Sequence, residues 1–274
     1  NRGRTPDCMG KCLTGDIHYL STMIRIGVLG CGNIGHIIAK YRENCEIVAL
    51  YDQVYSRALE LAALSGGTAY QDFESFITGD FDYVVEAASV RAVRQYAEMV
   101  LAKRKHLILL SVGALADPNF REDLVRIARV TGTHIHIPSG AILGLDNLKV
   151  GQISPIRRLL LRTTKSPGSL GITTAERCLV FQGKSHECIK EFPKNVNVSV
   201  ALSLAAGRDA DVELYADPSV ERNIHEIEAE GDFGEVYIRV SNVPSPDNPA
   251  TSYLAALSIL TLLKNLEQPL VVGT

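Results

Sequence analysis

The sequence lacks the features that define several large classes of protein. No uninterrupted apolar run approaches the roughly 18–20 residues that span a bilayer, and the apolar stretch 252–266 is too short and contains Lys264. Lysine and arginine together number 28 against 31 acidic residues, so the formal net charge is −3 and no basic surplus exists for a nucleic-acid backbone. We therefore expect neither a membrane nor a nucleic acid as a partner.

Cysteine is sparse, and its spacing excludes further roles. The six cysteines are scattered through 274 residues, a length that can bury a core without disulfides, which favours a reducing, cytoplasmic location. Cys8 and Cys12 have no second Cys/His pair at ligand spacing, so we expect no zinc site and assign no metal-binding residue. Residues 1–22 lack the pattern of a secretory signal, and we expect them to form a flexible extension before Met23.

The most informative feature that is present is an apolar strand, residues 24–29, followed by a glycine-rich turn. Gly30, Gly32 and Gly35 have the G-x-G-x-x-G spacing, in which the glycines permit a tight turn, admit a diphosphate and allow helix and strand to pack closely. The helix that follows directs its N-terminus at the anion. Such turns also join strands to helices where nothing binds. The candidate cofactor contacts are Gly30, Gly32, Asn33, Ile34 and Gly35.

A second apolar strand, residues 46–51, ends at Asp52, about twenty residues beyond the glycines. A carboxylate at this place accepts hydrogen bonds from the ribose hydroxyls of adenosine, so Asp52 favours NAD over NADP. Arg57 follows shortly after and offers a contact for a 2′-phosphate, which keeps NADP as the alternative cofactor. The other interpretation of Asp52 is a solvated aspartate in a loop between a strand and a helix.

The first half of the chain alternates regularly between strands and helices. An apolar run over 83–89 ends in Ala88 and Ser89, which we expect beside the cofactor because ligands bind beyond the carboxyl ends of parallel strands. This alternation predicts an α/β, Rossmann-type doubly wound parallel sheet with right-handed crossovers. The further helices and strands are expected over 90–103, 106–111, 120–131 and 134–138.

The pattern changes beyond Ala141. Short strands and two helices, over 185–191 and 196–206, predict a second α+β domain whose sheet is covered by helices on one face. The tail has a helix-start signal at 248–251 and helical apolar spacing after it, so we expect a C-terminal helix that returns to the nucleotide domain. The expected division is an extension 1–22, a dinucleotide-binding domain 23–141, a substrate-binding and catalytic domain 142–247, and the C-terminal helix 248–274.

Histidines are the first candidates for chemistry. His225 begins a strand that we expect at a sheet edge, facing the cofactor, and the unperturbed histidine pKa near 6.5 suits proton transfer. A hydrogen-bonded structural histidine gives the same local pattern. His106, His134 and His136 lie in predicted strands, where we expect structural roles.

Amides and cations supply further candidates. Asn195 or Asn197 either caps the helix that follows or contacts a ligand. Lys194 and the cluster 163–165 offer cations for a dianionic substrate. The segment 139–147 brings small residues and N–H groups to the domain junction, where it either contacts nicotinamide or a substrate carboxylate or serves as a hinge.

A set of short motifs runs through the chain from Met23 onward. After the glycine turn they are Glu86-Ala87-Ala88-Ser89, Ser139-Gly140-Ala141-Ile142, Gly144-Leu145-Asp146, Phe192-Pro193-Lys194-Asn195-Val196-Asn197, Asn223-Ile224-His225-Glu226, and Asn248-Pro249 followed by Thr251-Ser252-Tyr253-Leu254. Each is modest alone, but in this order they resemble the L-aspartate dehydrogenase family. Leu143 departs from the family pattern, because relatives often have a second glycine there.

The resemblance implies NAD(P)-dependent oxidation of L-aspartate to iminoaspartate, with reductive amination of oxaloacetate by ammonia as the reverse. It places His225 as the catalytic histidine and Ala141 and Asn195 as cofactor contacts. We choose Lys194, with Asn195 and His225, for substrate binding. The resemblance also implies a homodimer, joined through the second domain, and a role in supplying iminoaspartate for NAD biosynthesis.

Two other functions share this architecture. A Rossmann-fold reductase of another small acid, of the dihydrodipicolinate reductase type, would need its own substrate signature within 142–245, and none stands out there. A non-catalytic dinucleotide-sensing module would keep the fold and lose turnover. The presence of both His225 and Asn195 argues against that module.

Overall fold

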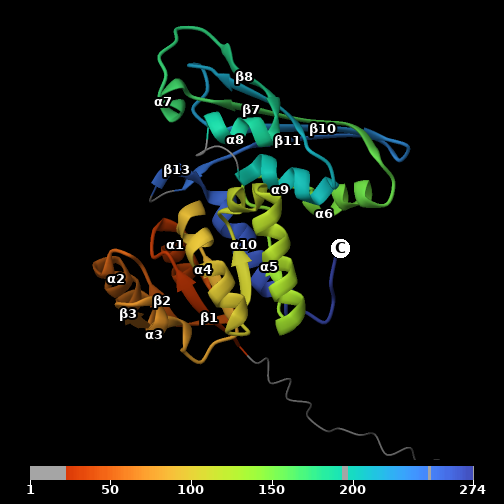
Figure 1. Ribbon diagram of the computed structural model, residues 1–274. Helices are drawn as coiled ribbons and strands as arrows, with labels where there is room; N and C mark the ends of the chain where they lie inside the picture. The colour runs from red at the N-terminus through yellow and green to blue at the C-terminus, as the bar shows by residue number, and fades with distance from the viewer. Residues whose placement is uncertain (1–22, 193–196, 246–247, 274) are drawn as a thin grey trace, which may run out of the picture.

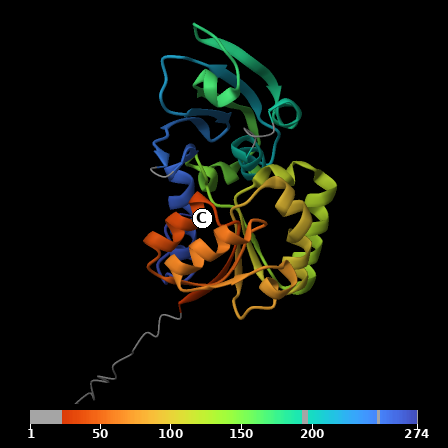
Figure 2. The same ribbon diagram turned by 90° about the vertical axis from the view of Figure 1, so that its left-hand side faces the viewer.

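The computed structural model describes residues 23–192, 197–245 and 248–273, which form two large sheets, one in each of two domains, and a small two-stranded sheet (Figure 1, Figure 2). The first sheet is parallel and has the strand order β3-β2-β1-β4-β5-β6. Successive strands are added on one side of β1 as far as β3 and on its other side from β4 onward, so the switch point lies between β1 and β4. This order confirms the predicted Rossmann-type fold. The strands are β1 (Ile24–Leu29), β2 (Cys45–Tyr51), β3 (Thr68–Tyr70), β4 (Tyr83–Glu86), β5 (His106–Leu109) and β6 (Ile135–His136).

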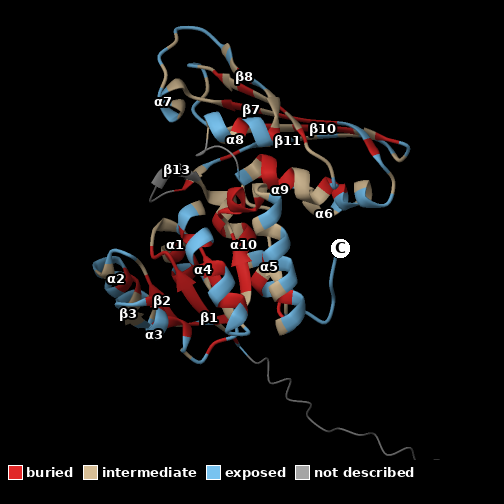
Figure 3. Ribbon diagram, viewed as in Figure 1, coloured by how far each residue is buried: buried red, intermediate tan, exposed pale blue. Residues whose placement is uncertain are grey.

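Helices cover both faces of the first sheet because its strands are apolar on both sides. Val84 and Val85 of β4 are fully buried in two different core clusters, as the alternation of side chains along a strand requires. Figure 3 shows these strands as buried and the outer faces of the surrounding helices as exposed. The helices are α1 (Asn33–Tyr41), α2 (Tyr55–Ser65), α3 (Phe73–Ile77), α4 (Val90–Ala102) and α5 (Pro118–Thr131), with a 3₁₀ turn η1 (Val112–Ala116).

The second sheet is mixed and has the order β11-β10-β7-β9-β8. Helices α8 (Ser185–Glu191) and α9 (Asn197–Ala206) cover one of its faces, where Cys188 and Leu202 are buried against the strands. The opposite face carries ion pairs, including those of Arg158 and Arg162 with Glu228. The sheet with helices on one face is therefore confirmed. Its strands are β7 (Ile156–Lys165), β8 (Cys178–Lys184), β9 (Asp211–Ala216), β10 (Ile224–Gly231) and β11 (Gly234–Ser241).

The C-terminal helix α10 (Tyr253–Asn265) packs on the first sheet. Ile259 and Leu263 are buried in the same core cluster as Ile38 of α1. On this basis we propose the division of the chain at 141/142 and 247/248. Across the described ranges, no helix combines the length and the apolarity needed to cross a bilayer. The remaining elements are α6 (Leu145–Leu148), η2 (Lys149–Gln152), α7 (Pro167–Leu170), β12 (Pro244–Ser245) and β13 (Asn248–Ser252).

Three details differ from the sequence predictions. The expected helix start at 248–251 is wrong, because this segment is strand β13, which pairs with β12, and α10 begins only at Tyr253. The strand expected over 134–138 is shorter, with only Ile135–His136 in the sheet. His225 does not lie at a sheet edge, because β10 is flanked by both β7 and β11. For His225, pairing of β10 with the distant strand β7 overrides the local pattern.

Candidate active site

The glycine turn joins β1 to α1, and each glycine there has a different environment. Gly30 has φ +98°, and a Cβ on it would lie 2.7 Å from the backbone of Ala88, so only glycine fits. A Cβ on Gly32 would meet no described atom within 4 Å. A Cβ on Gly35 would lie 2.8 Å from Leu61 of α2, so its tightest packing is between helices rather than between helix and strand. Only Gly32 therefore leaves space that a ligand could use.

The N-terminus of α1 is suited to an anion. No described side chain caps the helix at Gly32, and the first residues of the helix, with Gly32, line a cavity between the two domains. Asn33 donates from Nδ2 to Ser245 Oγ at 2.8 Å. Its Oδ1 is buried and has no hydrogen-bond partner among the described residues. A buried, unsatisfied acceptor is costly, and a bound group that donates to it removes that cost.

Asp52 is held at the end of β2 beside the glycine turn. Its carboxylate accepts hydrogen bonds from the Cys31 N–H at 2.9 Å and the Val54 N–H at 2.8 Å. It lines a cavity of about 240 Å³ that reaches from Gly30 to Arg57. Asp52 and Arg57 thus occupy the same cavity, as expected if both lie near the adenosine ribose.

Glu86 organises the loops at the carboxyl ends of β4 and β5. This fully buried carboxylate accepts hydrogen bonds from the N–H groups of Ala88, Ser89 and Ser111 and from the Ser111 hydroxyl, each at 2.9 Å. Burial raises its pKa, and these hydrogen bonds oppose the rise. Ala88 and Ser89 consequently line the cavity that contains Asp52. Sequence analysis assigned Glu86 no role, although a carboxylate at the end of an apolar strand is itself a signal.

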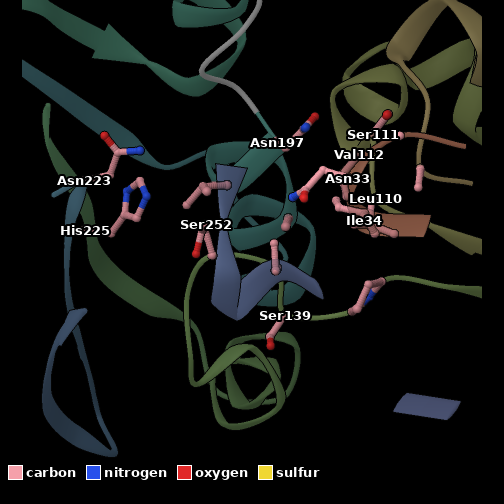
Figure 4. Close-up of a pocket in the computed structure, with 18 of the residues that line it drawn as sticks. Asn33, Ile34, Leu110, Ser111, Val112, Ser139, Asn197, Asn223, His225 and Ser252 are labelled. Carbon is pink, nitrogen blue, oxygen red and sulfur yellow. The ribbon is translucent and has the colours of Figure 1, made fainter. Parts of the chain in front are cut away.

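A larger cavity of about 430 Å³ lies between the two domains and adjoins the glycine turn. Figure 4 shows His225 and Asn223 on one side of it and Asn33, Ile34, Leu110, Ser111 and Val112 on the other. Cavities at the interface of two domains are a common location for small-molecule sites. The other lining residues are Gly32, Ala87, Ala88, Pro138, Ser139, Gly140, Ala141, Lys165, Asn197, Val198, Ala201, Ser252 and Ala255.

His225 is oriented by the strand next to it. It lies directly opposite Thr163 in the β7–β10 pair, and its Nδ1 is 2.9 Å from the Thr163 hydroxyl. The side chain is only 5 % exposed. Burial, and then the charge of Lys165, lower the pKa of His225 to about 3. The ring is therefore neutral near pH 7, and Nε2 is the nitrogen left for a substrate.

Lys165, the last residue of β7, places a cation in the same cavity. Its pKa is lowered mainly because the side chain is buried. Sequence analysis named it only within the cluster 163–165, and the β7–β10 register is what brings it beside His225. Lys194 and Asn195, which the sequence analysis had preferred, lie outside the described residues.

Asn197 begins α9, but its side chain contacts the other domain. Its Oδ1 accepts a hydrogen bond from the Gly113 N–H of η1 at 2.9 Å, so it links α9 to the loop after β5. Ala141 lines the cavity, and its carbonyl oxygen accepts a hydrogen bond from Asn242 Nδ2 at 2.9 Å. Sequence analysis missed Asn242, because no local pattern connects it with Ala141. Leu143, the departure from the family pattern noted above, is 50 % exposed.

The residues present fit a dinucleotide. The open side of Gly32, the uncapped start of α1, Asn33 with its unsatisfied Oδ1 and the Asp52 carboxylate mark a path along the carboxyl edge of the first sheet. This path comprises two cavities that share Gly32, Ala87 and Ala88, one containing Asp52 and the other His225. Fold and site together define a two-domain, NAD(P)-dependent dehydrogenase.

Family models match both halves of the chain. Residues 27–138 match the NAD binding domain of homoserine dehydrogenase, and residues 146–266 match the C-terminal domain of aspartate dehydrogenase. The second match covers the segment in which a dihydrodipicolinate reductase would need its own signature.

Full-length relatives agree with these matches. The chain is 62 % identical over 252 residues to an L-aspartate dehydrogenase of Methanospirillum hungatei, and the alignment covers 92 % of this chain and 100 % of the relative. It is 42 % identical to an L-aspartate dehydrogenase of Methanothermobacter thermautotrophicus, with 92 % and 99 % covered. A crystal structure of aspartate dehydrogenase from Thermotoga maritima superposes with a TM-score of 0.78 at 30 % identity, covering 91 % and 99 %. The chain belongs to the L-aspartate dehydrogenase family.

Proposed function

We propose that the protein catalyses the NAD(P)-dependent oxidation of L-aspartate to iminoaspartate and, in reverse, the reductive amination of oxaloacetate. The observation that carries the proposal is a buried, neutral His225 beside the cation Lys165, across the cavity from the glycine turn. The relatives named L-aspartate dehydrogenase support the choice of substrate. A dicarboxylate matches a cavity that contains a buried cation.

The proposed cofactor site follows the path described above. Asp52 would hold the adenosine ribose, the first turn of α1 the pyrophosphate, and Ala141, with Asn195, the nicotinamide end. When bound, NAD(P)⁺ supplies a hydride acceptor at C4 of its nicotinamide. Two hydrogen bonds hold the Asp52 carboxylate in place, and a carboxylate at this position favours NAD. Arg57 provides the contact that would admit NADP.

Lys165 is our choice for binding a substrate carboxylate. It replaces Lys194 as the first candidate because it lines the cavity together with His225. A partly desolvated ammonium forms a stronger ion pair than one in water, because the local dielectric constant is lower. The amides of Asn223, beside His225, and of Asn197, toward Val112 and Asn33, line the same cavity and offer further donors. Lys194 and Asn195 stay proposals for the same role.

His225 would take the proton that blocks the reaction. Hydride leaves Cα only when the amine nitrogen can donate its lone pair, so the substrate ammonium must first lose a proton. In the tautomer that donates its Nδ1–H to the Thr163 hydroxyl, the Nε2 lone pair is left to accept that proton. The Cα–H electron pair then departs as hydride, the nitrogen lone pair forms the C=N bond, and the products are protonated iminoaspartate and the reduced cofactor.

The low pKa of His225 in the free protein is matched to a dianionic substrate. Lys165 and burial favour the neutral ring when no substrate is bound. Two carboxylates entering the cavity offset the charge of Lys165 and stabilise an imidazolium. His225 would therefore become a stronger base only when the substrate is in place.

Initial rates of NAD(P)H formation test the proposal. L-aspartate is compared with a panel of other amino and hydroxy acids, and oxaloacetate with ammonia is used for the reverse reaction. We expect turnover with L-aspartate well above every other acid of the panel. Binding of NAD(P)H without turnover of any of them would favour a sensing module instead.

We further infer a homodimer and a place in the supply of iminoaspartate for NAD biosynthesis. Both rest on the family resemblance, whereas the proposed cytoplasmic location rests on the scattered cysteines. Light scattering coupled to size-exclusion chromatography tests the first, with twice the chain mass of 29.8 kDa as the expected result.

A further inference from the structure

Three histidines lie together at the amino ends of β5 and β6, at the end of the first sheet away from the cavity with His225. His106 begins β5, His134 directly precedes β6, and His136 is the second residue of β6. Leu107 pairs with Ile135, so His106 and His134 are neighbours across the two strands. His134 and His136 share one face of the sheet because side chains alternate along a strand.

The three rings converge closely. Each offers one ring nitrogen, and the three nitrogens lie within 4.8 Å of one another. Among the described residues this is the one group of at least three His, Cys, Asp or Glu side chains that meets this condition. The ring centroids are 5.3, 5.8 and 6.3 Å apart, so the rings form a nearly equilateral triangle.

These distances match the ligand set of a tetrahedral metal ion. Metal–nitrogen bonds of about 2.0–2.1 Å place two ligand nitrogens about 3.4 Å apart. The Nδ1 atoms of His106 and His134 are 3.3 Å apart. These two ring nitrogens share a hydrogen bond, and His106 Nδ1 also accepts the His134 N–H at 3.0 Å, so an ion bound there would replace both hydrogen bonds.

The surroundings of the cluster suit a cation, and neutral imidazole is the form of histidine that binds metals. Asp82 provides a negative charge close to His106. His134 is exposed, which gives an ion access from solvent.

We propose that His106, His134 and His136 bind one divalent transition-metal ion of the Zn²⁺ class, with water as the fourth ligand. Three imidazoles favour Zn²⁺ and its neighbours over Mg²⁺ or Ca²⁺, which prefer oxygen ligands. The ion would tie β6, an edge strand of two residues, to β5. Its role is structural, because the site lies at the opposite end of the strands from the cavity, and it does not depend on the proposed function.

Isothermal titration of the full chain with ZnCl₂ tests the site. Because Cys8 and Cys12 are also metal ligands by type, every protein carries Cys8→Ser and Cys12→Ser. In that background we expect one Zn²⁺ per chain, and at least about tenfold weaker binding after His134→Ala. His186→Ala, at an exposed histidine on α8, is the matched control and should bind as before. No Zn²⁺ binding in the background protein, or equal binding after His134→Ala, would overturn the proposal.

Thermal unfolding and activity separate a structural site from an adventitious one. Zn²⁺ should raise the Tm of the background protein and of His186→Ala, but not that of His134→Ala, because only a site formed in the folded state stabilises it. The rate of aspartate oxidation should be the same in His134→Ala and the background. A Tm that Zn²⁺ leaves unchanged in the background protein would overturn the structural role.

Discussion

The imidazole of His225 and the hydroxyl of Thr163 face each other across the β7–β10 pair, with Nδ1 and Oγ1 2.9 Å apart. The contact joins two strands of one rigid sheet, so the orientation of the ring is set by the backbone register rather than by a loop. Lys165 is two residues beyond Thr163 on the same strand, and strand alternation therefore brings it to the same face. Strand β7 thus orients the proposed base, His225, and carries Lys165, the residue proposed to bind a substrate carboxylate.

Replacement of the proposed base should abolish most turnover. We expect His225→Asn to lower kcat by about two to four orders of magnitude, because His225 is the one histidine or carboxylate among the described residues that line the cavity. The Kd for NADH, measured by fluorescence, should stay nearly unchanged. His186→Asn, on the exposed side of α8, is the control. If His225→Asn retains normal turnover, His225 is not the base.

Replacement of the buried cation should weaken substrate binding more than cofactor binding. We expect Lys165→Met to raise the KM for L-aspartate at least about tenfold, since a charge-assisted contact to a carboxylate is lost while the apolar volume is kept. Lys190→Met, at an exposed lysine of α8, should leave KM unchanged. An unaltered KM in Lys165→Met would return the role to Lys194.

The pKa of His225 should depend on what occupies the cavity. In the free protein it lies far below 6.5, at about 3, so the ring C2–H resonance should not titrate between pH 8 and 5. A saturating, unreactive dicarboxylate such as succinate adds negative charge, favours the protonated ring and therefore raises this pKa. NMR titration with and without succinate measures both values. An identical pKa in the two titrations would contradict the proposed coupling.

The carboxylate of Asp52 should determine the choice of cofactor. We expect Asp52→Ala to raise the KM for NAD⁺ at least about tenfold and to shift the ratio of kcat/KM values toward NADP⁺, because the acceptor for the ribose hydroxyls is removed and Arg57 remains. Glu60→Ala, at an exposed position of α2, is the control. An unchanged preference would exclude Asp52 from the ribose site.

Glu86 should be a stability determinant of the cofactor site. All four groups bonded to its carboxylate are donors, so the amide of Glu86→Gln would place an NH₂ group against a donor. The free energy of unfolding should fall by about 1–3 kcal/mol, the cost of a buried group left unsatisfied. Urea denaturation measures the change, and the exposed Glu98→Gln should stay within about 0.5 kcal/mol of the parent. A parent-like stability for Glu86→Gln would mean that the loops do not depend on this carboxylate.

Local patterns along the chain were sufficient to predict the first domain and its cofactor turn. Parallel βα units bury both faces of every strand, so each strand appears in the sequence as an apolar run, and the glycine spacing marks the turn that follows the first strand. Gly30, with its positive φ and its contact with Ala88, is the clearest example. The sequence also predicted that the second domain is α+β. The order of the short motifs pointed to His225 as the candidate catalytic histidine.

Only the tertiary structure decided which polar side chains share a cavity. Lys165 meets His225 through strand register, Asn242 holds Ala141 across about a hundred residues of sequence, and Asn197 bonds to Gly113 of the other domain. The cluster of His106, His134 and His136 likewise exists because two parallel strands pair in one register. A sequence pattern reports which face of an element is buried, because burial is a local property, whereas contacts between elements depend on pairing that no local window contains.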